Sequence, residues 1–219
     1  EAANNYLQAA GTPAFYDNKF SCTRKAVPWR PGRGFVGIEP KIYGLQTAIV
    51  VGPKGSEIHT DQYGRVRVQF HWDRIGGYDE KSSAWIRVAS SWTGKGYGFV
   101  SIPRVGQEVV VQFLDGNPDR PLITGCVYNQ DNMPPFGLPA GAHKTGFQTR
   151  STPGGGGLCE MVIHDDAGKE LINILSQKDM VTTVLNDKTT TVHSNHSTTV
   201  NGAKQTIAVG PVASQIAIK

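Results

Sequence analysis

The basic and aromatic side chains between residues 65 and 85 could form a nucleic-acid-binding face. The set consists of Arg65, Arg67, His71, Arg74, Trp72 and Trp85. Small β-barrels bind single strands with such a combination, since cations contact phosphates while aromatic rings stack on bases. In the alternating run 65–72, however, Trp72 has the parity of Val66 and Val68, which predicts that its ring is buried. The polar residues of opposite parity, Gln69 among them, are expected to face solvent. Nucleic-acid binding therefore stays an alternative, which the net charge of +4 does little to favour.

The candidates for metal binding or acid–base chemistry are two pairs of neighbouring residues. His193 and His196 could bind a metal around the symmetry axis of an oligomer. His193 has the parity of outward residues and His196 falls at a corner, so we interpret both as solvated surface side chains. Asp165 and Asp166 are adjacent, and an extended chain sends adjacent side chains to opposite faces. A turn is the better interpretation of this second pair.

Motifs for covalent catalysis or cofactor binding are missing from the sequence. There is no G-x-S-x-G nucleophile motif. The run Gly154–Gly157 lacks the helix and the lysine that a phosphate-binding loop requires. Cys22, Cys126 and Cys159 are far apart and odd in number, which fits neither a disulfide framework nor a metal site and indicates a reducing compartment. We therefore expect no cofactor, no metal and no enzyme active site.

An eight-residue repeat dominates the C-terminal part of the chain. Residues 182–189, 190–197 and 198–205 each begin with Thr-Thr-Val, and a looser copy starts at Thr206. A fixed short period predicts a repeat architecture. Thr and Val favour strands, whereas Asn, Asp and Gly favour corners. A coil of eight residues encloses almost no core, so the repeat predicts that several identical chains wrap around one another.

Three such chains would form a triangular prism whose inward positions recur every eight residues. We expect the core of this trimer to consist of Val184, Val192, Val200, Ile207 and Val209. Residues of opposite parity, such as Thr191 and His193, would face water. A disordered polar tail is the alternative that composition allows, and the strict register of the repeat argues against it.

The rest of the chain predicts an all-β protein with four parts. Residues 1–42 have too few apolar side chains for a core of their own. Residues 43–128 predict a small barrel of the OB type, with five strands at 44–51, 65–72, 84–91, 107–114 and 122–128. Residues 129–159 predict a linker, because their prolines should prevent regular pairing, and residues 160–219 predict the needle. No signal peptide or apolar span is evident, and because the chain opens on Glu1 we expect it to be a piece of a longer protein.

Three long motifs resemble one family. The first covers residues 47–73 and contains GRVRVQFHWD, and the second covers residues 102–121 and contains IPRVGQEV and DGNPDRP. The third is QTRSTPGGGG at residues 148–157, and residues 16–20 followed by Pro28 resemble the end of a hub domain. Together they resemble VgrG, the valine-glycine repeat protein that forms the type VI secretion spike and is related to contractile-phage tail spike and baseplate proteins.

This resemblance implies a trimer with a phage-hub-like base, an OB collar and an intertwined triple-stranded β-helix needle. Residues 1–42 would then be a remnant of the hub. In the family, the needle stands on the tube protein Hcp and the baseplate, and it carries a PAAR-repeat tip protein and effectors. It is assembled in the bacterial cytoplasm and driven by a contracting sheath through the membrane of a target cell. Most of the hub and any effector domain are absent from this sequence, and the linker has no room for the lysozyme domain of the related phage spike.

The resemblance thus predicts a structural, membrane-puncturing protein and not an enzyme. Two alternatives stay open: an OB-fold protein that binds nucleic acid, and a spike with lytic activity.

Overall fold

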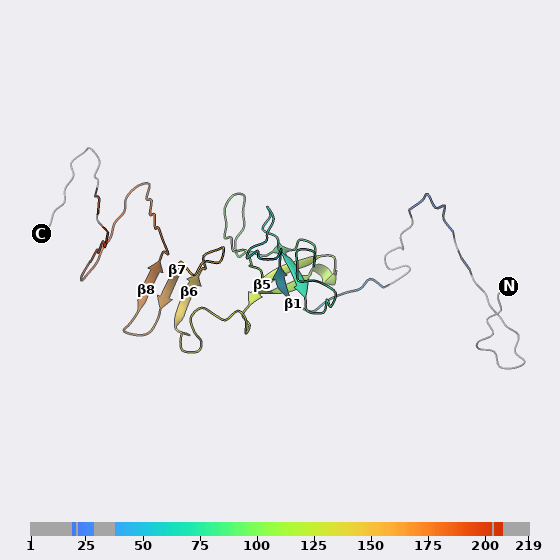
Figure 1. Cartoon of the computed structure of the whole chain (residues 1–219), viewed down its shortest axis with the longest axis horizontal. Coiled ribbons are helices and arrows are strands. Elements are labelled where there is room, and N and C mark those ends of the chain that lie inside the picture. The colour runs from blue at the N-terminus through green and yellow to red at the C-terminus, as the bar shows by residue number, and fades with distance from the viewer. Residues whose placement is uncertain (1–18, 21, 29–37, 203, 208–219) are drawn as a thin grey trace, which may run out of the picture. The chain divides into compact units, whose positions relative to one another are not determined.

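The computed structural model describes residues 19–20, 22–28, 38–202 and 204–207 (Figure 1). Within these residues the regular structure consists of strands, apart from a single 3-10 turn at Leu114–Gly116. No helix in this described part is long and apolar enough to cross a membrane. The expected core residue Val209 lies outside the described residues, as do most of residues 1–42.

Five strands form the first sheet, in the order β2-β1-β4-β5-β3. Neighbours are antiparallel except β3 and β5. The two edge strands are joined where Val66, just before β2, exchanges hydrogen bonds of 3.0 and 2.8 Å with Ile86, just before β3. This bridge closes the sheet into a barrel. The strands are β1 (Gln46–Val51), β2 (Arg67–Phe70), β3 (Arg87–Val88), β4 (Glu108–Phe113) and β5 (Pro121–Val127).

The barrel interior is filled by side chains at alternate positions of these strands. In β4 the buried residues are Val109, Val111 and Phe113, as the two-residue period of a strand with one buried face requires. The core also contains Ala48, Val50, Val66, Val68, Ile86 and Ile123. The third strand is shorter than the sequence predicts, because only Arg87 and Val88 pair with β5.

Two side chains of the run 65–72 differ from the sequence expectation. Trp72 is 62% exposed; the expectation of a buried ring is wrong because β2 ends at Phe70 and the chain turns there. The ring instead stacks on Phe70 at 5.1 Å, and its Nε1–H donates to Gln46 Oε1 at 2.8 Å. Gln69 is fully buried, and its amide donates to the Asp73 carbonyl at 2.9 Å within the turn. Parity therefore fails for Trp72 because the strand has ended, and it fails for Gln69 within the paired strand because the turn with Asp73 and Gly76 covers this side chain.

A second sheet contains three antiparallel strands in the order β6-β7-β8 (Figure 1). These are β6 (Lys144–Gln148), β7 (Glu160–His164) and β8 (Leu171–Leu175). β6 lies in the segment 129–159, so the expectation that prolines prevent regular pairing there is wrong. The prolines at 134, 135, 139 and 153 flank β6 without entering it. Gly146 allows β7 to approach closely, because a Cβ at this position would lie 2.2 Å from the Met161 carbonyl oxygen.

The chain divides into two parts, residues 1–175 and 176–219. In the second part, the described residues form no hydrogen-bonded strand within one chain, but they bend at 177–178, 185–186, 193–194 and 202. The first three bends are eight residues apart; those at 185–186 and 193–194 directly follow Val184 and Val192, and the bend at 202 comes two residues after Val200. The eight-residue period that the sequence predicts is therefore present in the backbone. A ladder of hydrogen bonds between strands would need further chains.

Candidate assembly interface

One face of the second sheet is apolar and exposed. The register pairs Phe147 with Met161 and Met161 with Ile174, and it pairs Ile163 with Ile172, so these side chains share a face. Their exposed fractions run from 36% to 63%. We call this set the apolar sheet face: Phe147, Met161, Ile163, Ile172 and Ile174. A contiguous apolar surface of this kind marks a site of contact with another protein surface.

The opposite face of the same sheet carries a polar network beside the exposed side chains of Leu171 and Leu175. The Glu160 carboxylate accepts a hydrogen bond from the Gln148 amide at 3.0 Å and another from the Asn173 amide at 2.8 Å. This network crosses all three strands, from β6 through β7 to β8. Val162 on this face is buried. The apolar sheet face is therefore displayed by strands whose register is fixed from behind.

The repeat valines have one common environment. Val184, Val192 and Val200 are 46%, 47% and 47% exposed, whereas Leu185 is 99% exposed. The same half-burial at each repeat shows that the backbone presents these valines equivalently. None of them belongs to the buried core cluster of the described residues. Ile207 is more exposed, at 70%.

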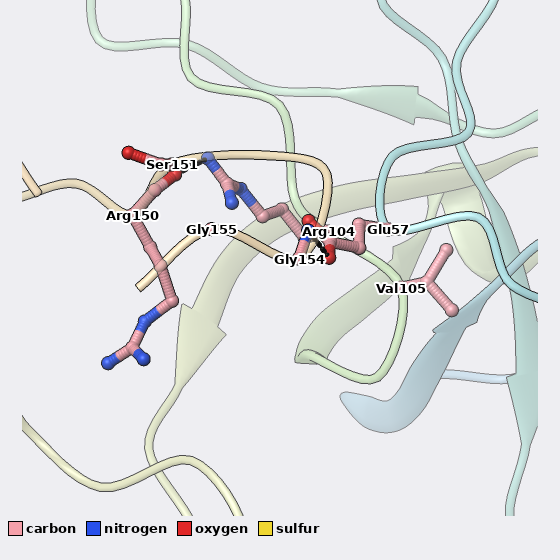
Figure 2. A pocket seen from close by; sticks show the side chains of 7 residues that line it. All are labelled: Glu57, Arg104, Val105, Arg150, Ser151, Gly154 and Gly155. Carbon is pink, nitrogen blue, oxygen red and sulfur yellow. Dashed lines mark hydrogen bonds between the residues drawn. The ribbon is translucent and has the colours of Figure 1, made fainter. Parts of the chain in front are cut away.

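A turn of the linker contacts the barrel beside a pocket of about 340 Å³ (Figure 2). The Gly154 amide donates to the Glu57 carboxylate at 2.5 Å, and the Arg104 guanidinium donates to the Arg150 carbonyl at 2.9 Å. The Arg150 guanidinium itself points away from Glu57 in Figure 2. We call these interactions the barrel–linker contact.

Glycine makes this turn possible. Gly154 has a φ of +61°, in the left-handed region that favours glycine. A Cβ on Gly155 would lie 2.6 Å from the Ser151 Cβ. The resulting turn directs the Gly154 amide at the Glu57 carboxylate of the same chain.

Hydrogen bonds set the ionisation of Glu57. The Thr152 side chain and then the Gly154 amide lower the pKa of this carboxyl, and the Arg104 guanidinium adds to the effect, while partial desolvation opposes it. Donors to a carboxylate stabilise its charged form. Glu57 is therefore an anion that the linker turn recognises.

Comparisons with known proteins match both sheets. Residues 47–128 match the family described as the type VI secretion system and phage-baseplate injector OB domain. Residues 145–215 match the bacteriophage T4 gp5 C-terminal trimerisation domain. Three Pseudomonas aeruginosa spike proteins of the type VI secretion system are similar: VgrG4b is 49% identical over 79% of this chain, VgrG5 is 48% identical over 79%, and VgrG1a is 51% identical over 68%. The chain belongs to the VgrG spike family.

The family matches confirm the all-β fold class, with an OB barrel followed by the β-helix of a trimerisation domain. The chain spans 21%, 22% and 23% of the length of these three VgrG relatives.

The candidate nucleic-acid residues do not form one free surface. Arg65 forms an ion pair with Asp61 at 2.7 Å. Arg67 lies over the Trp85 ring at 4.6 Å, and Trp85 also contacts His59 at 4.8 Å. The remaining candidates are exposed: His71 lies 3.8 Å from the Glu108 carboxylate, and Arg74 is also at the surface.

The other candidate residues are dispersed along the surface. His193 and His196 are exposed, and the described part of the chain holds no cluster of three or more metal-binding side chains. Asp166 forms an ion pair with Lys169 at 3.7 Å and accepts the Lys169 amide hydrogen bond at 2.8 Å, as a turn requires. The three cysteines are free and exposed.

Sequence reasoning missed the apolar sheet face and the barrel–linker contact. The first left only a weak signal: Ile172 and Ile174 alternate around Asn173, but Met161 and Ile163 stand on either side of the apolar Val162. Phe147 was hidden in a segment interpreted as a linker. The second left no signal, since Glu57 and Gly154 are 97 residues apart.

Proposed function

We propose that this chain forms the collar and shaft of a trimeric spike in a type VI secretion apparatus. The observation that carries the proposal is the common half-burial of Val184, Val192 and Val200 at a spacing of eight residues. Each of these octads has one half-exposed valine, and the described residues after 175 form no strand pairing within the chain. Exposed strand edges demand pairing, and two further copies would supply both the strand partners and the core.

The proposed trimer core consists of the predicted residues Val184, Val192, Val200, Ile207 and Val209. Around a threefold axis the valines of the three chains would pack together in layers about 4.8 Å apart. Bends after each valine would turn the chain onto the next side of the prism. Thr191 and His193 would face water and keep the shaft soluble.

The function of this spike is mechanical. Wound chains cannot separate without unfolding, so the shaft resists force through a slow rate of unfolding. Membrane puncture needs a stiff, closed shaft and no active site, and the proposed role is accordingly structural and not enzymatic.

The partners follow from the family. The spike would stand on the tube protein Hcp and the baseplate at its hub end, and it would carry a PAAR-repeat tip protein and effectors at the needle end. It would be assembled in the bacterial cytoplasm and then secreted or injected into a target cell. The names of the VgrG relatives, which call them spike proteins of the type VI secretion system, support this assignment.

Light scattering of the purified chain after size-exclusion chromatography tests the proposal. The expected mass is three times 23.7 kDa. A monomer at micromolar concentration would overturn the proposed function, because one chain has neither the core nor the strand partners that the shaft needs.

A further inference from the structure

We propose that the apolar sheet face sets the register in which three copies of this chain align, with the same face of the other two copies as its occupant. This inference rests on the proposed trimer. It assigns the alignment of the three chains to residues that precede the repeat.

The strict octads cannot choose their own alignment. Residues 182–184, 190–192 and 198–200 are each Thr-Thr-Val. If one chain slips by eight residues, its Val192 takes the place of Val184 and its Val200 takes the place of Val192. Such a slip changes the packing only at the start of the shaft and in the looser copy that follows Val200. Register is weakly specified wherever a slip leaves the buried face unchanged. Contacts outside the strict octads must therefore fix how the three chains align.

The apolar sheet face supplies side chains that such a slip would misplace. The three strands are held together by antiparallel pairing within one chain, so a slip in the repeat would shift this sheet as a body along the shaft. The apolar sheet face of the slipped chain would then no longer lie fully against the same face of the other two copies. Apolar side chains left in water cost free energy, and so does the cavity left between the other two copies. The correct alignment is therefore the one that buries this face most completely.

Three observations favour copies of the same chain as the occupant. The match to a trimerisation domain starts at residue 145, within β6, and continues through the octads. The repeat follows β8 directly, since β8 ends at Leu175 and the first bend of the eight-residue series is at 177–178. The opposite face is held by the Glu160 network, with amides from Gln148 and Asn173. The apolar sheet face therefore lies where the match to the trimerisation domain begins, and it is available to the other copies of the chain.

The test compares a double variant of the apolar face with a matched control from the same strand. Ile172→Asn with Ile174→Asn makes the apolar face polar. Leu171→Asn changes a comparably exposed residue, 53% against 63% and 57%, on the other face of β8. Each full-length chain is unfolded, refolded and measured by light scattering and by methyl NMR of valine-labelled protein.

Symmetry provides the readout. In an aligned homotrimer the three copies of Val192 are equivalent and give one set of methyl resonances, which a Val192→Ala sample assigns. A slipped trimer has inequivalent chains and gives several sets. We expect one set for the wild type and for Leu171→Asn, and several sets for the double variant.

The outcomes separate the two proposals. A monomeric wild type would overturn the trimer itself. A trimeric wild type together with a double variant that still gives one set would overturn the alignment role and leave the trimer intact. If the double variant is monomeric, the single variant Ile172→Thr decides by the same readout, with several sets supporting the role and one set overturning it.

Discussion

Arg67 shows how a side chain on the outer face of a barrel strand becomes part of its structure. The alternation of residues 65–72 predicts a solvated arginine. Its guanidinium instead lies 4.6 Å above the Trp85 ring, and it donates a hydrogen bond to the Glu80 carbonyl. The stack continues from Trp85 to His59. Arg67 therefore ties β2 to two loops of the barrel, which an exposed cation would not do.

We expect Arg67→Ala to lower the free energy of unfolding of the barrel by about 1–2 kcal/mol. A cation over a tryptophan face contributes about 0.5–2 kcal/mol, depending on its desolvation, and the Glu80 carbonyl loses a donor. Arg74→Ala is the control, because Arg74 is exposed and surface changes usually stay within about 0.5 kcal/mol. Urea denaturation followed by tryptophan fluorescence measures both. Equal effects of the two variants would contradict the structural role of Arg67.

At the scale of elements, the barrel–linker contact joins a Gly-rich turn to the barrel through the Glu57 carboxylate and the Arg104 guanidinium. Glu57 accepts the Gly154 amide, and Val105 donates its amide to the Glu57 carbonyl at 3.0 Å. The same residue thus holds the linker through its side chain and the barrel through its backbone. The linker is consequently anchored at this turn, in spite of its glycine content.

This contact should weaken in acid. The pKa of Glu57 is lowered from its ordinary value of 4.5, first by the Thr152 hydroxyl, then by the Gly154 amide. Because the folded pKa is depressed, the stabilisation is complete above the unfolded value and is lost as pH falls through the folded one. We expect the Gly154 amide proton shift to titrate with a midpoint below 4.5, and to lose this titration in Glu57→Gln. A midpoint at or above 4.5 in the wild type would contradict the contact.

The sequence predicts the barrel well, because strand periodicity is a local signal. Val66 and Val68 are buried as their parity requires. The prediction of burial fails where a strand ends although the alternation of apolar and polar residues continues. Nothing in the residues themselves shows that β2 ends at Phe70, so the parity of Trp72 is misleading.

The second sheet illustrates the other limit of local reasoning. β6 pairs with β7 across a loop of eleven residues that contains a proline and four glycines, and composition alone identifies such a segment as a linker. The apolar sheet face emerges only when the three strands are placed in register. The contact of Glu57 with Gly154 is non-local in the same sense, and no pattern within either segment predicts it.

At the scale of the whole molecule, the repeat region depends on partners that one chain cannot supply. In the described residues after 175 there is no strand pairing within the chain, although the bends recur with the repeat. The half-exposed valines define the side on which the partners would pack. We therefore expect this region to fold only in the oligomer, so that mutations there act on assembly before they act on the barrel.

We expect Val192→Asp to abolish the shaft while the barrel stays folded. In the proposed trimer the change places three carboxylates together on the axis, where like charges in a poorly solvated core repel strongly. Thr191→Asp is the matched control, since it adds the same charge one residue away at a position of outward parity. Light scattering should give three times 23.7 kDa for the wild type and for Thr191→Asp, and a smaller mass for Val192→Asp. Tryptophan fluorescence should be unchanged in both variants, because the four tryptophans, including Trp72 and Trp85, all precede residue 93. If Thr191→Asp dissociates the protein and Val192→Asp does not, then the inward register of the shaft is the opposite of the one proposed here.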